Sequence, residues 1–253
     1  MALTKPPGWY VISLRPRGGH ESLRQAAAAH GAKLIALSPW RLEPRVDAQV
    51  RESLRQALAA PCVLFTSPAA VRAAAGAVPL RRHDATQAWL AVGAGTARAL
   101  REAGIDAVQA PARMDAEGLL AMPALQQVRG IRVGLVTAPN GREFLPPALQ
   151  QRGAEVLRAD VYARVPVPLA VTALRRLRTL DLPAALVLSS GGALEQVLSA
   201  LPQDLQERLR TLPTVAASTR LQELARARGF GDVVVAAGPL PAQLLAAISH
   251  RFR

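Results

Sequence analysis

Short apolar runs alternate with longer stretches of helical periodicity along most of the chain. Apolar runs of this length, bounded by turn-forming residues, are typical of strands buried on both faces of a sheet. They predict ten strands, at Tyr10–Leu14, Leu34–Leu37, Cys62–Thr66, Trp89–Val92, Ala107–Gln109, Val133–Thr137, Val156–Val161, Ala185–Ser189, Thr214–Ala217 and Val233–Ala236.

The stretches between many of these runs have the spacing of amphipathic helices. Examples are Ala97–Ala103, Glu143–Arg152 and Leu221–Arg228. A glycine follows each example at the point where a helix end favours left-handed backbone; these are Gly104, Gly153 and Gly229. Strand, helix, glycine and strand in succession predict an α/β fold with parallel sheets covered by helices on both faces.

Ten strands are too many for one regular sheet in a chain of 253 residues, so we expect two smaller sheets. Two proline-bearing extended segments, Pro39–Arg45 and Tyr162–Pro168, break the alternation. They indicate a pair of linkers. We therefore predict two α/β domains joined by a two-stranded linker: a discontinuous domain of residues 1–39 plus 167–253, an inserted domain of residues 45–161, and linkers at 40–44 and 162–166.

An internal repeat supports two related halves. The segment VLFTSPAAV (63–71) has the same form as LVLSSGGAL (186–194), and AVGAGTARALREAG (91–104) matches AASTRLQELARARG (216–229). Each half thus offers a strand followed by hydroxyls, then a strand ending in small residues before a helix.

The hydroxyls that end these apolar runs are candidate ligand groups. Thr66, Ser67, Ser189 and Ser190 stand where parallel strands lead into helices, which is where open α/β sheets bind ligands. Helix N-termini there also attract anions. The alternative is that these residues are N-caps, for which Ser and Thr are favoured. We expect the four positions to face one another across a cleft between the domains.

Two glycine-bearing turns extend the candidate site. VGAGT (92–96), with Gly95 and Thr96, lacks the last glycine of a dinucleotide fingerprint because Arg98 takes its place. It predicts close backbone approach to an anion and no nucleotide cofactor. In the second turn Gly141 precedes Arg142, a cation at a helix start, where the helix dipole disfavours it. Arg142 either faces an anionic ligand or is a solvated side chain.

One tyrosine is a candidate proton donor. Tyr162 lies at the end of a predicted strand, at the domain crossing. Its hydroxyl either donates a proton to a departing group or packs at the linker. The four histidines are dispersed and the single cysteine, Cys62, has no partner spacing, so no metal site is predicted. His20 follows two glycines and either lies near a ligand or is a surface loop residue, which we expect.

The charge balance is strongly basic, with 31 basic and 18 acidic side chains and a net charge of +13. A basic surface attracts polyanions, whereas coding bias in a chain rich in Ala and Arg gives the same composition. The basic residues are scattered along helices without a zinc pattern or aromatic-basic signature, so no nucleic-acid partner is predicted.

Location and assembly follow from further absences in the sequence. There is no apolar run of eighteen residues, no signal-peptide pattern at the N-terminus, and no pair of cysteines for a disulfide. We expect a cytoplasmic protein without a membrane span. Nothing indicates an obligate interface, so a monomer is expected.

Taken in order, the motifs resemble those of the uroporphyrinogen-III synthase family. FTSPAAV (65–71) is similar to FTS-x-N-A-V, with Ala69 where the family has Asn, and VGAGTARALREAG (92–104) matches closely. Arg15-Pro16 resembles the start of the family pattern, although Leu14 replaces the usual Thr. Further similar segments are AEGLL (116–120), NGREFLPPALQQRGAEV (140–156), Asp160-Val-Tyr162, VLSSGGAL (187–194) and ASTRLQELARARGF (217–230).

The resemblance implies two flavodoxin-like domains with the active site between them, and a cofactor-free enzyme of tetrapyrrole (haem) synthesis. Its substrate would be hydroxymethylbilane, a linear tetrapyrrole with eight carboxylates. The enzyme would release water, invert ring D and close uroporphyrinogen III. Tyr162 would assist loss of the hydroxyl. The expected substrate-binding residues are Arg15, Thr66, Ser67, Gly95, Thr96, Gly141, Arg142, Ser189, Ser190 and Ser218.

Two other classes of protein stay open at this point. A two-lobed binding protein for an anionic small molecule would use similar lobes and linkers without chemistry. A nucleic-acid-binding regulator is suggested by the charge alone. Formation of a tetrapyrrole ring, or salt-dependent binding of nucleic acid, would separate these alternatives from the synthase.

Overall fold

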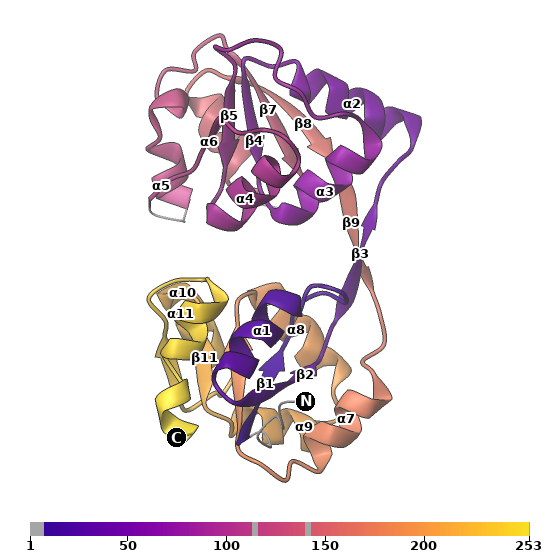
Figure 1. The fold of residues 1–253 in the computed structure, drawn as a ribbon, viewed down its shortest axis with the longest axis vertical. Coiled ribbons are helices and arrows are strands. Elements are labelled where there is room, and N and C mark those ends of the chain that lie inside the picture. The colour runs from indigo at the N-terminus through magenta and orange to yellow at the C-terminus, as the bar shows by residue number, and fades with distance from the viewer. Residues whose placement is uncertain (1–7, 113–115, 140–142, 253) are drawn as a thin grey trace, which may run out of the picture. The chain divides into compact units, whose positions relative to one another are not determined.

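A computed structural model describes residues 8–112, 116–139 and 143–252, without the side chains of residues 116 and 117. The chain divides into two compact units, each drawn in Figure 1. The discontinuous unit contains residues 1–41 and 165–253, and the inserted unit contains residues 42–164. Each has its own parallel five-stranded sheet, so the predicted α/β class with two parallel sheets is confirmed.

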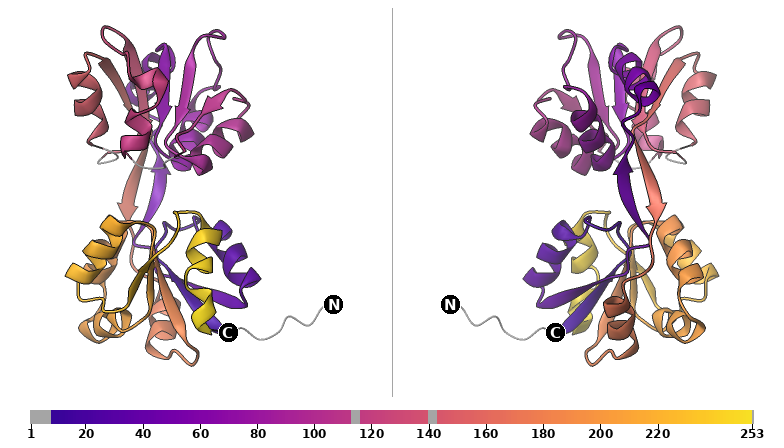
Figure 2. Two further views of the ribbon diagram at one scale, coloured as in Figure 1. Left: turned by 90° about the vertical axis from the view of Figure 1, so that its left-hand side faces the viewer. Right: turned by 90° about the vertical axis from the view of Figure 1, so that its right-hand side faces the viewer.

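The sheet of the discontinuous unit has the order β12-β11-β10-β1-β2, with every pairing parallel. Helices cover both of its faces (Figure 2). The elements are β1 (Trp9–Ser13), α1 (Glu21–Ala29), β2 (Ala32–Ala36), α7 (Val171–Arg178), β10 (Ala184–Leu188), α8 (Gly191–Ala200), α9 (Gln203–Arg210), β11 (Thr214–Ala216), α10 (Thr219–Ala227), β12 (Val233–Val235), α11 (Pro241–Ala246) and the 3₁₀ turn η2 (Ser249–Phe252).

Two apolar clusters build this unit, one on each face of the sheet. Tyr10 and Ile12 pack with α7, α8, α9 and α10 on one face. Trp9 and Val11 pack with α1 and α11 on the other. Since successive strand residues point to opposite faces, the fully buried β1 fills both clusters, as expected of a central strand.

The sheet of the inserted unit has the order β6-β5-β4-β7-β8 and is also entirely parallel. Its elements are α2 (Ala48–Leu58), β4 (Cys62–Phe65), α3 (Pro68–Ala77), β5 (Ala88–Ala91), α4 (Ala94–Glu102), β6 (Val108–Gln109), α5 (Ala116–Leu120), the 3₁₀ turn η1 (Pro123–Leu125), β7 (Arg132–Thr137), α6 (Leu145–Gln151) and β8 (Glu155–Asp160). The helices α2, α3 and α4 cover one face, and α5 and α6 cover the other.

The two sheets have the same spatial arrangement of strands, but the chain forms those strands in a different order. The strands β4, β5, β6, β7 and β8 of one unit correspond in position to β10, β11, β12, β1 and β2 of the other. The sequence repeat falls on these matched elements, with VLFTSPAAV on β4 and α3 and LVLSSGGAL on β10 and α8. The predicted repeat is therefore also a structural repeat.

A two-stranded sheet carries the chain between the units. It pairs β3 (Trp40–Pro44) with β9 (Tyr162–Pro166). Backbone hydrogen bonds from Val167 to Pro39 and from Arg45 to Val161 continue the pair at its two ends. By the correspondence of the sheets, Trp40 and Tyr162 stand at equivalent positions, each as the first residue of a strand of this pair.

The predicted strands all occur, with small shifts in their bounds. Most end one residue earlier than predicted, so Thr66 and Ser189 follow β4 and β10 instead of ending them. Gly104, Gly153 and Gly229 have φ of 89°, 84° and 86°, which confirms their predicted left-handed conformation. This positive φ is accessible to glycine at little cost.

Candidate active site

The order of strands defines where each sheet would bind a ligand. The progression of the chain across the sheet reverses between β4 and β7 in the inserted unit, and between β1 and β10 in the discontinuous unit. Ligands of open α/β sheets bind beyond the carboxyl ends of the strands at such a switch point. Thr66 and Ser67 follow β4, Arg15 follows β1, and Ser189 and Ser190 follow β10.

Ser67 and Tyr162 meet at the carboxyl edge of the inserted unit. The two hydroxyl oxygens are 3.2 Å apart, and either can donate. Ser67 is also the N-cap of α3 and accepts from the backbone amide of Ala70 at 3.1 Å. Tyr162 is 5% exposed and packs in the same apolar cluster as α3. The structure thus brings the predicted proton donor and one predicted binding residue into direct contact.

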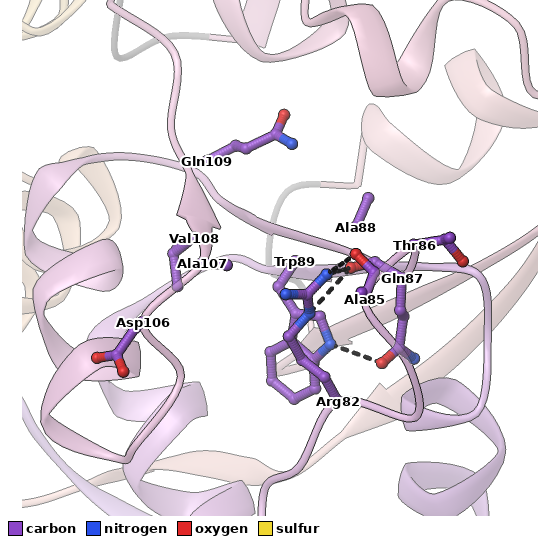
Figure 3. Close-up of a pocket in the computed structure, with 10 residues that line it drawn as sticks. All are labelled: Arg82, Ala85, Thr86, Gln87, Ala88, Trp89, Asp106, Ala107, Val108 and Gln109. Atoms are coloured by element: carbon purple, nitrogen blue, oxygen red, sulfur yellow. Dashed lines mark hydrogen bonds between the residues drawn. The ribbon is translucent and has the colours of Figure 1, made fainter.

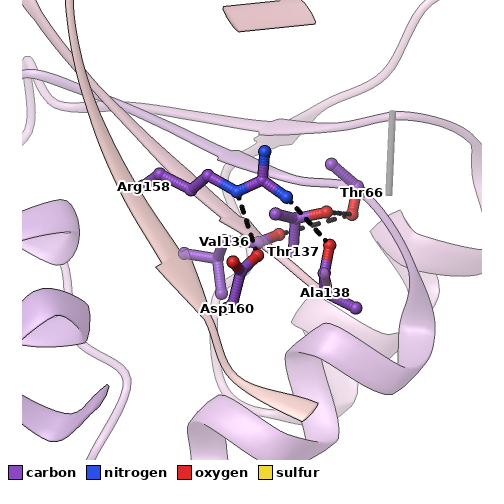
Figure 4. Close-up of polar contacts among 6 residues, drawn as sticks. All are labelled: Thr66, Val136, Thr137, Ala138, Arg158 and Asp160. Carbon is purple, nitrogen blue, oxygen red and sulfur yellow. Dashed lines mark hydrogen bonds and ion pairs between the residues drawn. The ribbon is translucent and has the colours of Figure 1, made fainter. Parts of the chain in front are cut away.

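Thr66 is tied to the neighbouring strand. Its hydroxyl donates to Oγ1 of Thr137 at 2.8 Å, with a longer contact to the carbonyl of Val136 (Figure 4). Both threonines are buried. The side chain of Thr66 therefore joins β4 to β7 across the switch point and is not an N-cap.

An ion pair beside these threonines was not predicted from the sequence. Arg158 binds Asp160 through Nε at 3.0 Å and donates from Nη2 to the carbonyl of Ala138 at 3.1 Å (Figure 4). The two residues are two apart on β8 and share one face of the sheet. Two opposite charges spaced two residues apart on a predicted strand could have indicated this ion pair. The contact with Ala138 holds the start of the segment that follows β7.

Gly95 and Thr96 lie in the first turn of α4, which begins after the N-cap Gly93. Thr96 is buried. A Cβ added at Gly95 would lie 3.7 Å from the ring of Pro68, the first residue of α3. The first turns of α3 and α4 are therefore adjacent, and both helix N-termini lie at the same edge of the sheet.

Ser190 and Ser218 are N-caps in the discontinuous unit. Ser190 accepts from the amide of Ala193 at 3.3 Å at the start of α8, and Ser218 accepts from the amide of Leu221 at 3.4 Å at the start of α10. For Ser67 and Ser190 the predicted capping role is confirmed, and Ser218 is a further N-cap that the sequence pattern did not single out. A capping oxygen accepts its bond, so each hydroxyl proton stays available to a ligand. Ser189 is exposed one residue before the α8 cap.

Arg15 is half-buried in the loop after β1. Its Nη1 donates to the hydroxyl of Ser22 at 3.0 Å. Burial lowers the pKa of Arg15 from its ordinary value, which lies so high that the side chain remains a cation at neutral pH. Gly141 and Arg142 lie outside the described residues.

The expectation that His20 is a surface residue is wrong. His20 is 7% exposed, with Nδ1 2.9 Å from the hydroxyl of Ser13 and Nε2 2.7 Å from that of Ser38. Burial, and then the charges of Arg24 and Arg15, lower its pKa to about 4. The imidazole is therefore neutral at pH 7. Two glycines before it had suggested an open loop, whereas they allow the chain to turn back over the sheet.

A hollow lies away from these residues, at the amino end of β5 (Figure 3). Its volume is about 380 Å³. Arg82 donates to the carbonyls of Ala85 and Gln87, while the Gln87 side chain binds Leu58, Ala60 and the indole of Trp89. These bonds hold the segment before β5 against the end of α2.

Membrane spans and metal clusters are both absent from the part of the chain that the structure describes. Over residues 8–112, 116–139 and 143–252, no helix combines the length and apolar character needed to cross a membrane. Within those same ranges, no cluster of three or more His, Cys, Asp or Glu side chains is placed to hold a metal ion.

The fold and the edges described above define a two-unit α/β protein with hydroxyls, helix N-termini and an arginine at the carboxyl edges of its two sheets. A family model for uroporphyrinogen-III synthase HemD matches residues 21–246. The chain belongs to the uroporphyrinogen-III synthase family.

Two curated relatives carry the same description. The uroporphyrinogen-III synthase of Escherichia coli K12 is 33% identical over 153 residues, covering 58% of this chain and 61% of that protein. A putative uroporphyrinogen-III synthase of Methanothermobacter thermautotrophicus is 32% identical over 169 residues, covering 64% of this chain and 61% of that protein. The matched part thus spans about three-fifths of the length of these relatives.

Solved structures support the fold. A mutant uroporphyrinogen III synthase of Thermus thermophilus superposes with a TM-score of 0.60 at 24% identity, over 94% of this chain and 96% of that one. The uroporphyrinogen-III synthetase of Helicobacter pylori 26695 gives 0.58 at 15% identity, over 96% and 99%. Both likenesses concern the fold alone.

Proposed function

We propose that this protein is a uroporphyrinogen-III synthase, which dehydrates and cyclises hydroxymethylbilane with inversion of ring D. The observation that carries the proposal is the family match over residues 21–246. The carboxyl edges of the two sheets support it, since both present hydroxyls and helix N-termini suited to a polycarboxylate.

The proposed reaction needs little covalent chemistry from the protein, because the substrate supplies the reacting groups. Loss of the hydroxyl as water leaves an electrophilic carbon on the substrate, and the electrons of its own ring D form the new bond. The protein must hold a flexible polyanion so that the substituted carbon of ring D attacks that electrophilic carbon. The bond from this ring D carbon to its original bridge then breaks and re-forms at the unsubstituted carbon of ring D, which loses a proton, so that the ring is inverted. Catalysis is then mainly positioning and electrostatic stabilisation.

Tyr162 is the proposed donor of the proton that leaves with the hydroxyl. The bond to Ser67 supports this role, because it fixes the phenol at the carboxyl edge beside the first turn of α3. Since Ser67 already accepts a bond from Ala70, its own proton is free to bond to the phenol oxygen. Such a bond would stabilise the phenolate that remains after proton transfer.

The other proposed site residues bind substrate through three kinds of group. Ser189, Ser190 and Ser218 offer hydroxyls, Gly95 offers a backbone amide, and Arg15 offers a charge, while Ser67 acts through its bond to Tyr162. Thr66 and Thr96 are proposed to act through backbone groups, because their side chains are buried. Gly141 and Arg142 complete the proposed set, which is Arg15, Thr66, Ser67, Gly95, Thr96, Gly141, Arg142, Ser189, Ser190 and Ser218.

We also propose that the enzyme needs no cofactor, because the overall reaction is a loss of water with no net transfer of electrons. A monomer in the cytoplasm is the proposed working state. The two units are proposed to be separate domains, with residues 40–44 and 162–166 as their linkers, on the basis that each has its own sheet and apolar clusters.

Analysis of the product isomer tests the function directly. Freshly generated hydroxymethylbilane is incubated with the purified protein, and the oxidised porphyrins are separated by chromatography. Isomer III should predominate, against isomer I without protein. Isomer I alone, from protein shown to be folded by circular dichroism, would overturn the proposal and favour a binding protein for an anionic small molecule.

A further inference from the structure

A small cavity lies beside His20, within the discontinuous unit and apart from the residues assigned above. Its volume is about 150 Å³. A water molecule occupies about 30 Å³ in the liquid, so the cavity has room for a carboxylate and part of its methylene stem. It is lined by Arg17, His20, Ala36, Ser38, Pro168 and Ala170.

The hydroxyls of Ser13 and Ser38 fix the floor of this cavity by binding His20. Ser13 ends β1 and Ser38 follows β2, so one imidazole joins the carboxyl ends of two neighbouring strands. A neutral imidazole has one donor and one acceptor nitrogen. The imidazole therefore determines whether the Ser38 hydroxyl donates or accepts in their bond. Burial keeps the imidazole uncharged at neutral pH.

Arg17 supplies the charge at the cavity. Its backbone amide donates to the carbonyl of Trp40 at 2.9 Å, which fixes the loop after β1. The amide of Gly19 donates to the carbonyl of Pro16 at 2.9 Å and tightens the same loop. The lining contains no acidic side chain. Arg17 is exposed, so its guanidinium can reach a ligand in solution. An arginine beside a hydroxyl and apolar walls suits an anion, because a hydrogen bond between charged groups is stronger than one between neutral groups.

We propose that this cavity is a subsite for one carboxylate of the substrate, with Arg17 and Ser38 as its ligands and His20 as their positioning residue. The proposal rests on the proposed function for the identity of the substrate. Its place fits that function, since the loop carrying Arg17 also carries Arg15 and lies at the β1 side of the switch point.

Substitution of Arg17 gives the primary test. Arg17→Gln removes a hydrogen bond between charged groups and so should weaken substrate binding. We expect KM for hydroxymethylbilane to rise about tenfold or more, with kcat changed less than about threefold. Arg51→Gln is the matched control, because it removes the same charge from an exposed position on α2 in the other unit. The control should change KM less than twofold.

The positioning role of His20 needs a separate pair of variants. His20→Gln keeps a donor and an acceptor for the two serines, so its KM should stay close to that of wild type. His20→Phe keeps a planar ring without either, so its KM should rise towards that of Arg17→Gln. Equal KM values in both His20 variants and the wild type would remove His20 from this role, provided that circular dichroism shows both folded.

Binding of uroporphyrin I, a stable octacarboxylate, gives a readout independent of turnover. Quenching of tryptophan fluorescence by uroporphyrin I should show several-fold weaker binding to Arg17→Gln and His20→Phe than to wild type and Arg51→Gln. KM and uroporphyrin affinity that both stay within twofold of wild type in Arg17→Gln would overturn the subsite. A wild type that makes isomer I alone would instead overturn the proposed function, while weakened uroporphyrin binding by Arg17→Gln would still support an anion site.

Discussion

Ser67 binds Tyr162 and caps α3 with a single oxygen. The same arrangement of a capping serine at the strand end recurs at Ser190. Helix capping and substrate binding are therefore compatible roles for these hydroxyls. Substitution of a serine at such a position would both fray a helix and remove a proposed ligand contact, so its effect on activity alone would not separate the two roles.

Tyr162→Phe avoids this ambiguity. It removes the phenolic hydroxyl, keeps the buried ring and leaves the bond between Ser67 and Ala70 in place. We expect kcat to fall by about ten- to a hundredfold, at the lower end of general-acid effects, while the melting temperature changes by less than about 3 °C. Because the proposed catalysis is distributed, some activity should remain.

Tyr10→Phe is the matched control, since Tyr10 is the other tyrosine of the chain and lies buried on β1. It should leave kcat within twofold of wild type. If Tyr162→Phe turned over as fast as Tyr10→Phe, Tyr162 would have no part in proton transfer.

His20 predicts a pH dependence of stability. Its folded-state pKa of about 4 lies below its ordinary value of 6.5. Between these two values the unfolded chain binds a proton that the folded chain does not, so the contribution of His20 is complete above pH 6.5 and is lost as the pH falls towards 4. The total loss should be at most about 3 kcal/mol.

Urea unfolding at about pH 7, 5.5 and 4 measures this contribution. The free energy of unfolding of wild type should fall over the range by up to about 3 kcal/mol more than that of His20→Gln, which cannot titrate. Parallel pH curves for the two proteins would show that His20 is not held neutral by the fold.

Gly134 shows how closely α2 packs on its sheet. A Cβ at this position of β7 would collide with the backbone of Ala57, including its carbonyl oxygen, near the end of α2. The helix can approach the strand to this distance because residue 134 has no side chain. Backbone on both sides of the contact leaves no flexible side chain to move aside.

Gly134→Ala should therefore destabilise the inserted unit by about 3 kcal/mol or more, at the upper end of overpacking costs. Gly76→Ala is the control, because the exposed Gly76 lies in α3 and a Cβ added there would meet open space. That control should be neutral or stabilise by roughly 0.5–1 kcal/mol. Chemical denaturation of both variants checks the pair, and equal stabilities would contradict the packing.

The elements themselves were largely predictable, because local patterns carry them. The apolar β1 and β4 read as buried strands, and Gly104, Gly153 and Gly229 marked helix ends. The bond between His20 and Ser38 was not predictable, since the partners come from different elements and meet only in the folded sheet. The Arg158–Asp160 pair could have been predicted, because residues two apart on a strand lie on the same face of the sheet.

Prediction of the candidate site was limited in a similar way. The sequence pattern placed Thr66, Ser67 and Tyr162 at strand ends, yet not the bond that joins Ser67 to Tyr162. It also offered capping or ligand binding for Thr66, whereas the side chain binds Thr137. Contacts across a sheet depend on strand order, and the local pattern of apolar and polar residues does not reveal that order.

Each unit makes its apolar clusters from its own residues. Both clusters of the inserted unit fall within residues 42–164, which form one continuous stretch. We therefore expect a fragment of residues 42–164 to fold alone and to unfold cooperatively in urea.

Circular dichroism and urea unfolding of this fragment test the expectation, and the fragment with Gly134→Ala is its internal control. The variant fragment should unfold at lower urea concentration. A fragment without a cooperative transition would show that the inserted unit depends on the rest of the chain.

The permuted strand order also affects how the protein is made on the ribosome. Tyr10 pairs with Ala184, which the ribosome adds much later. At roughly 5–20 residues per second, about 10–30 s pass before the emerging chain supplies the central neighbour of β1. During that time the nascent segment carrying β1 and β2 has an unpaired apolar edge, while the inserted unit can already close. Early binding by a chaperone, or aggregation during rapid expression, is therefore expected to begin at the first strand.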